Sequence, residues 1–172
     1  MGQLSVDLNT KGKDAKRALP RDQRTGVSFP RFFTARLEAD GRLTPLTDEA
    51  NTTGPAVSPD GQWLYYFLDD TTPGGGQWSV KRVRLDGTAR ETLLVADGPL
   101  PETNYRLSHL YPLSTISADG QRLAICGFLG DGQTPNAPWG LVVCDLATGT
   151  VQLVLEGPTW CNIHPQYCRS TD

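Results

Sequence analysis

The sequence has few of the features that mark membrane, exported or nucleic-acid-binding proteins. No apolar stretch in its 172 residues approaches the roughly 18 that a transmembrane helix needs. Residues 1–24 are polar and contain no apolar signal-peptide segment. The 16 Lys and Arg are scattered among 19 Asp and Glu, so no basic stripe could neutralise a run of phosphates. We therefore expect no nucleic-acid partner, no membrane partner and a cytoplasmic location, unless the native chain begins upstream of Met1 with a signal peptide.

Cysteine is also sparse, with 4 residues spaced irregularly. They have neither the density of a disulfide scaffold nor the paired spacing of a zinc site. Cys126 and Cys144 lie inside apolar runs, where we expect free, buried thiols that pack as small apolar groups. Cys161 and Cys168 flank His164, which leaves metal binding open as an alternative.

Glycine and proline are abundant, at 18 and 13 residues, and favour short strands joined by tight turns over a helical bundle. The segment AVSPDGQWL at residues 56–64 returns as TISADGQRL at residues 115–123. Each copy reads as an apolar strand end, a Ser-x-Asp-Gly turn and a second apolar strand. In such a turn glycine accepts a positive φ and aspartate binds the nearby backbone, so each copy predicts a hairpin.

A second hairpin follows each copy, turning at residues 86–87 and at residues 147–149. Two hairpins in series make a four-stranded antiparallel meander, which is one blade of a β-propeller. We therefore predict an all-β, incomplete β-propeller with two complete blades flanked by partial ones. The predicted parts are a flexible segment or blade remnant at 1–26, a half blade at 27–50, blades at 51–98 and 108–157, and the start of another at 160–172. Closed propellers use about 4–8 blades, so we expect a fragment of a longer protein, the rival being several copies assembled into a ring.

Two motifs resemble known propeller families. The Ser-Pro-Asp-Gly turn at residues 58–61, with its weaker copy at residues 117–120, resembles the repeat of TolB-like propellers. The segment NIHPQYCRSTD at residues 162–172, preceded by the turn DLATG at residues 145–149, resembles the oligogalacturonate lyases of pectin breakdown. The resemblance extends from about Leu37 to the end of the chain, and most of it is the general propeller repeat.

The resemblance to the lyases implies a reaction, a cofactor and a metal ligand. In that family a strand-opening His-Pro segment supplies one ligand of a divalent metal, usually manganese, and later blades supply further histidines and a glutamine. Here His164 matches that ligand, so the resemblance implies manganese only in the intact protein. The implied substrate is an oligogalacturonide or another uronate saccharide. It is cleaved by β-elimination, in which a base removes the C5 proton beside the carboxylate.

A histidine suits the role of base, and arginine suits bidentate contact with a carboxylate. The candidate base is His109, in the connection at residues 97–110 just before a predicted first strand. Arg106 and Arg84 are the candidate carboxylate contacts. Each also has an ordinary structural interpretation, as a solvated loop histidine or as a surface arginine that covers apolar area.

Trp160 and Gln166 are the candidate substrate-binding residues beside His164, and packing between blades is the ordinary role of such a tryptophan. With one metal ligand and one base, we expect the chain alone to be inactive. The alternative function is a non-catalytic TolB-like propeller that binds protein or saccharide on its channel face.

Overall fold

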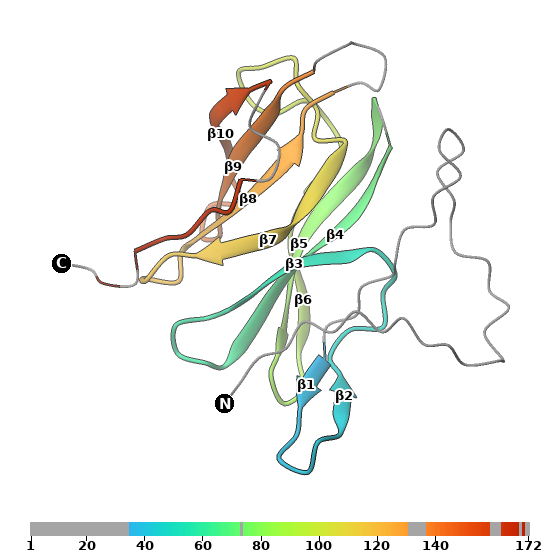
Figure 1. The fold of residues 1–172 in the computed structure, drawn as a ribbon, viewed down its shortest axis with the longest axis vertical. Helices are drawn as coiled ribbons and strands as arrows, with labels where there is room; N and C mark the ends of the chain where they lie inside the picture. The colour runs from blue at the N-terminus through green and yellow to red at the C-terminus, as the bar shows by residue number, and fades with distance from the viewer. Residues whose placement is uncertain (1–34, 73, 131–136, 159–162, 169, 171–172) are drawn as a thin grey trace, which may run out of the picture.

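A computed structural model describes residues 35–72, 74–130, 137–158, 163–168 and 170, which form an all-β fold (Figure 1). The described residues contain no helix, and therefore none that could span a membrane. The prediction of an all-β chain is confirmed. The predicted N-terminal segment at 1–26, the first part of the predicted half blade and Trp160 lie outside the described residues.

The strands form one hairpin and two four-stranded sheets, with every pair antiparallel and neighbouring strands consecutive in the chain. The hairpin consists of β1 (Ala35–Leu37) and β2 (Leu43–Pro45). The first sheet consists of β3 (Thr52–Val57), β4 (Trp63–Thr72), β5 (Gly75–Arg84) and β6 (Arg90–Ala96). The second sheet consists of β7 (His109–Ile116), β8 (Arg122–Phe128), β9 (Trp139–Asp145) and β10 (Val151–Gly157).

The repeated Ser-x-Asp-Gly turns adopt the same geometry in both sheets. In the first copy, Ser58 Oγ accepts a hydrogen bond from the Trp63 backbone N–H at 2.9 Å. Asp60 Oδ1 accepts one from the Gln62 backbone N–H at 3.0 Å. Ser117 and Asp119 make the corresponding bonds at 2.9 and 3.0 Å, and the two turn glycines have φ of 68° and 72°. Hydrogen bonds from the serine hydroxyl and the backbone hold the pKa of both aspartates below its usual value. The repeat seen in the sequence is therefore a repeat in three dimensions.

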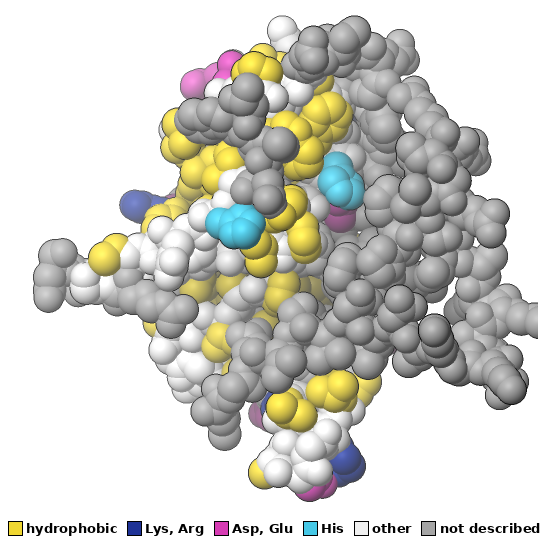
Figure 2. All heavy atoms as spheres, in the orientation of Figure 1, with side chains coloured by type: hydrophobic (Ala, Val, Ile, Leu, Met, Phe, Trp, Pro, Cys, Tyr) yellow, Lys and Arg dark blue, Asp and Glu magenta, His cyan; other side chains and the backbone are white. Residues whose placement is uncertain are grey.

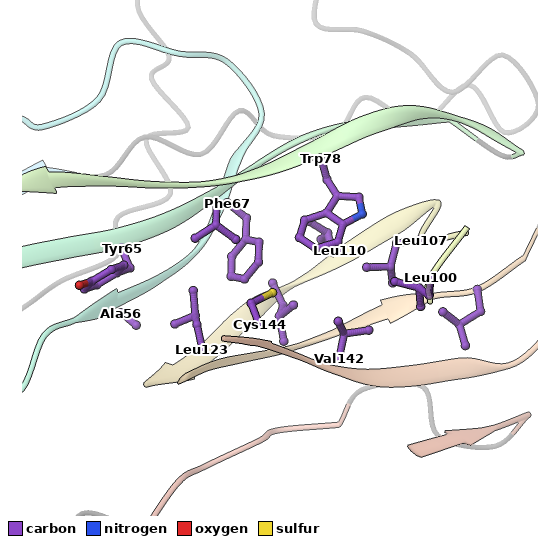
Figure 3. Close-up of a cluster of buried hydrophobic side chains, with 13 residues drawn as sticks. Ala56, Tyr65, Phe67, Trp78, Leu100, Leu107, Leu110, Leu123, Val142 and Cys144 are labelled. Carbon is purple, nitrogen blue, oxygen red and sulfur yellow. The ribbon is translucent and has the colours of Figure 1, made fainter. Parts of the chain in front are cut away.

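The two four-stranded sheets pack face to face around a shared apolar core (Figure 3). Strand alternation directs every second side chain of β4 and β8 into this core, and each large side chain buried there contributes about 1.5–3 kcal/mol. The side chains that meet between the sheets include Tyr65, Phe67, Trp78 and Val80 from the first sheet, and Leu123, Ile125, Val142 and Cys144 from the second.

The opposite face of the first sheet carries a second apolar cluster. Leu64, Tyr66 and Val83 point away from the second sheet and pack with Leu46, which follows β2. The segment that contains Leu46 is fixed to the sheet by polar bonds as well, since Glu49 accepts the Tyr66 hydroxyl at 2.8 Å. The chain thus builds layers in sequence order: the segment after β2, the first sheet and the second sheet.

The first strands of the two sheets, β3 and β7, are in direct contact at Gly54. The Ser114 hydroxyl donates to the Gly54 carbonyl at 2.6 Å, and Gly54 has a φ of 54°. A Cβ at this position would lie 2.8 Å from Ile125 Cδ1 and 3.2 Å from Phe67 Cδ2. Glycine is therefore required here both by the backbone conformation and by the close packing of the core.

We expect Gly54→Ala to lower the free energy of unfolding more than Gly87→Ala, a matched control. Gly87 has a φ of 84° but no atom within 4 Å of its Cβ position. In both variants alanine must adopt a left-handed backbone conformation, which destabilises the folded state by about 1–2 kcal/mol. Only Gly54→Ala also overpacks the core, which destabilises it by about a further 1–3 kcal/mol. Urea unfolding of the two variants measures the difference, and equal losses would contradict the close approach at Gly54.

Cys126 and Cys144 are free and buried, as predicted. Burial raises the pKa of the Cys126 thiol to about 11 and that of Cys144 to about 12, because the thiolate is disfavoured in apolar surroundings. Cys168 is exposed, and Cys161 lies outside the described residues.

Iodoacetamide near neutral pH should modify Cys168 in the folded protein and leave Cys126 and Cys144 unmodified until urea is added. The thiolate is the form that reacts with iodoacetamide. Burial disfavours loss of the thiol proton and also blocks access of the reagent. Mass spectrometry of the peptides reads out each site. A Cys126–Cys144 disulfide, or alkylation of either residue as fast as Cys168, would contradict the buried thiols.

Candidate functional site

The strand register gives the two sheets two chemically different ends. The repeated turns lie at one end, where Trp63 pairs with Arg84 and Arg122 pairs with Asp145, and we call it the Asp-Gly end. The β4–β5 turn, the connection at residues 97–108 and the start of β7 lie at the other end, which we call the His109 end. The predicted site residues divide between these ends.

His109 is the first residue of β7, is exposed, and pairs with Phe128 of β8. The N–H of the next residue, Leu110, donates to Asp69 Oδ2 at 2.8 Å. Asp69 lies on β4 of the first sheet, and its Oδ1 accepts both the N–H and the hydroxyl of Thr71, at 3.1 and 2.6 Å. A carboxylate of the first sheet therefore holds the backbone of the residue after His109 in the second sheet.

Arg106 lies at the same end, three residues before His109. Its Nη2 donates to the backbone carbonyl of Asp97 and, at 3.4 Å, to that of Gly76 at the start of β5. The guanidinium thus links the connection at residues 97–108 to the start of β5 in the first sheet. The structure brings Arg106 and His109 to one end of the sheets.

His164 lies beside the same strand. Its ring centroid is 6.0 Å from that of Tyr111, with an angle of 32° between the ring planes. The Tyr167 N–H donates to Thr115 Oγ1 at 3.2 Å, so residues 163–168 follow β7 in the same direction without forming a strand. Gln166 is exposed in this segment. Figure 2 shows both histidines on one face, with apolar side chains between them and an acidic side chain beside one of them.

Arg84 lies at the Asp-Gly end. Its Cζ is 5.0 Å from the centroid of the Trp63 ring, and its Nη1 donates to Gln62 Oε1 at 3.3 Å. Trp63 and Asp69 are six positions apart on β4, which is about 20 Å of strand. The structure therefore does not bring Arg84 together with His109, and Arg84 has the stacked, surface-covering role that arginine commonly takes.

The described residues do not fit a divalent metal ion. No group of three or more His, Cys, Asp or Glu side chains that could hold one occurs within the part of the chain that the structure describes. His164 contributes a single imidazole beside a tyrosine ring, whereas protein metal sites supply three or four ligands.

Two residues of this region were not predicted from the sequence. Asp69 directly follows the apolar run at residues 63–68. A charged residue at the end of such a run, where a buried strand would normally continue with apolar side chains, was the signal that could have identified it. Tyr111-Pro112 precedes Ser117 by the same spacing with which His164-Pro165 precedes Ser170. That matched spacing could have predicted the contact between Tyr111 and His164.

Comparison with known proteins identifies the fold. No family model and no curated protein matches the chain. Among solved structures, an oligogalacturonate lyase in complex with manganese matches with a TM-score of 0.53 and 17% identity, over 75% of this chain and 35% of that chain. An oligogalacturonate lyase from Vibrio parahaemolyticus matches with a TM-score of 0.53 and 14% identity, over 75% and 34% of the two chains. A TolB-like protein from Agrobacterium tumefaciens matches with a TM-score of 0.47 and 25% identity, over 73% and 41%.

The chain thus spans about a third of the length of the lyases that it matches. The resemblance to oligogalacturonate lyases seen in the sequence recurs among these structures. At such low identity the likeness to the lyases shows the fold alone, which is that of part of a β-propeller.

Proposed function

We propose that this chain is part of a β-propeller that, in its complete form, cleaves oligogalacturonides or related uronate saccharides by β-elimination. The observation that carries the proposal is the placement of the two histidines of the sequence. His109 begins β7, and His164 contacts Tyr111 two residues further along the same strand. The oligogalacturonate lyases share the fold, and one of them was solved with manganese.

The proposed roles follow from position and chemistry. His109 is exposed at the start of β7, and an imidazole can accept a proton, so it is the base that takes the C5 proton. Arg106, at the same end, offers a guanidinium to the uronate carboxylate, where negative charge grows as the proton leaves. Gln166 and Trp160 contact the sugar from the segment that carries His164. Arg84 has no part in this arrangement, because it lies at the opposite end of β5.

The blade assignment belongs to the same proposal. In it, β1 and β2 end a half blade at 27–50, the two four-stranded sheets are the complete blades at 51–98 and 108–157, and residues 160–172 begin another. Manganese binds only in the complete protein, with His164 as one ligand. The location of the protein is proposed to be cytoplasmic.

A second candidate function is a non-catalytic propeller that binds saccharide or protein on the same face. Arg106 favours it, because its Nη2 is bonded to the carbonyls of Asp97 and Gly76 and so acts in part to fix the loop. The described residues also contain no group of three or more His, Cys, Asp or Glu side chains that could hold a metal ion, which favours this candidate as well. Turnover by the complete protein separates the two candidates.

Digalacturonate should bind at the His109 end of this chain, shifting the backbone NMR signals of residues near the start of β7. We expect His109→Ala and Arg106→Gln to weaken binding about 10-fold each, the typical loss of one charge-assisted hydrogen bond. Arg84→Gln is the matched control, an arginine at the Asp-Gly end, and should leave the affinity unchanged. No shift near β7, or an equal loss in Arg84→Gln, would overturn the proposed site.

This chain with manganese and digalacturonate should form no unsaturated product, measured by ultraviolet absorbance. A single imidazole has too few bonds to hold the cation against water, so calorimetry should find no micromolar manganese binding. Product formation, or micromolar binding that His164→Ala abolishes, would show that this chain already carries a complete site.

A further inference from the structure

We infer that Asp69 is the positioning residue for His109, a role that rests on the proposed function of His109 as the base. Asp69 belongs to the first sheet and His109 to the second, so the contact crosses the boundary between the sheets. The sequence separation between Asp69 and Leu110 is 41 residues. Only the packing of the two sheets brings this carboxylate to the start of β7.

Asp69 is itself held at fixed points. Its backbone N–H donates to the Asn51 carbonyl at 3.0 Å. Its Oδ1 receives the Thr71 N–H and hydroxyl, which leaves Oδ2 for the Leu110 N–H at 2.8 Å. The side chain is partly buried, so these bonds are shielded from competing water. The carboxylate therefore presents a fixed acceptor to the residue next to His109.

The start of β7 needs such an anchor. His109 and Leu110 pair with Phe128 and Gly127, and the register then shifts before the ladder resumes at Ser114. The first two residues of β7 are thus separated from the regular part of the strand by the irregularity. The bond from Asp69 falls within this short section and fixes the backbone from which the His109 side chain projects.

The need for two acceptor oxygens explains why the residue is an aspartate. One oxygen serves Thr71 and the other serves Leu110. Asparagine has a single acceptor oxygen and turns an NH₂ group toward the other set of donors, so it can satisfy only one of them. Asparagine at this position can therefore keep the hydrogen bonds from Thr71 or the hydrogen bond from Leu110, but not both.

The first test measures hydrogen exchange of the Leu110 amide and the ring signals of His109 by NMR. Asp69→Ala should speed the Leu110 exchange about 10- to 100-fold, the factor for losing one bond to a charged acceptor, and should shift the His109 ring signals. Asp69→Asn should fall between Asp69→Ala and the unmodified chain. Asp70→Ala is the matched control, because Asp70 is exposed and bonds Asn51 instead. Its Leu110 exchange and His109 signals should be unchanged.

The methyl signals of Ile125 report whether the core between the sheets is intact in each variant. If Asp69→Ala unfolds the chain, the comparison between Asp69→Asn and Asp70→Ala decides the outcome. Unchanged Leu110 exchange and unchanged His109 signals in a folded Asp69 variant would overturn the inference. So would equal changes in the Asp70 variant.

The second test is a double-mutant cycle with digalacturonate as the probe. Asp69→Ala should weaken binding about as much as His109→Ala, roughly 10-fold, and the double variant should bind no more weakly than His109→Ala alone. A further loss in the double variant would show that Asp69 acts independently of His109 and would overturn the inference. If the unmodified chain does not bind digalacturonate, the proposed function fails, while Leu110 exchange and the His109 signals still decide whether Asp69 positions His109.

Discussion

The apolar contact between the two four-stranded sheets is the constraint on which the rest of the structure depends. Phe67 of the first sheet and Ile125 of the second meet where β3 and β7 come together, and Gly54 leaves the space in which they do so. Neither sheet could bury this face alone, because a meander of four strands has a core only on the side that another layer covers. Every contact across the sheets, polar or apolar, follows from this packing.

The same packing separates structural from chemical residues. The interface between the sheets is mainly apolar, and burial there raises the pKa of the Cys144 thiol to about 12. The groups that could act on a ligand lie at the strand ends, where connections leave the sheet and side chains reach water. At the His109 end a connection, a turn and the start of β7 converge. At the Asp-Gly end the serine and aspartate of each repeated turn are used in hydrogen bonds to the turn backbone.

Fold and function rest on different observations in this protein. The repeated meander and the likeness to solved lyases show a part of a β-propeller, a fold that serves many unrelated functions. The proposal of uronate chemistry depends instead on a small set of side chains, above all His109 with Arg106 beside it. The chain covers about a third of the lyases that it matches, so their activity comes to this chain only as a proposal.

The sequence by itself determined the strands and their turns. The Ser-x-Asp-Gly motif carries its own geometry, because Ser58 and Asp60 bond backbone groups within a few residues, and such local chemistry can be read without knowing the fold. Tertiary structure alone decided which candidates lie at the same end of the sheets. It placed Arg84 about 20 Å of strand away from the level of Asp69 and brought that carboxylate, 41 residues earlier, to the residue after His109. The physical reason is that strand register and sheet stacking join positions far apart in the chain, and no local pattern encodes the distance between them.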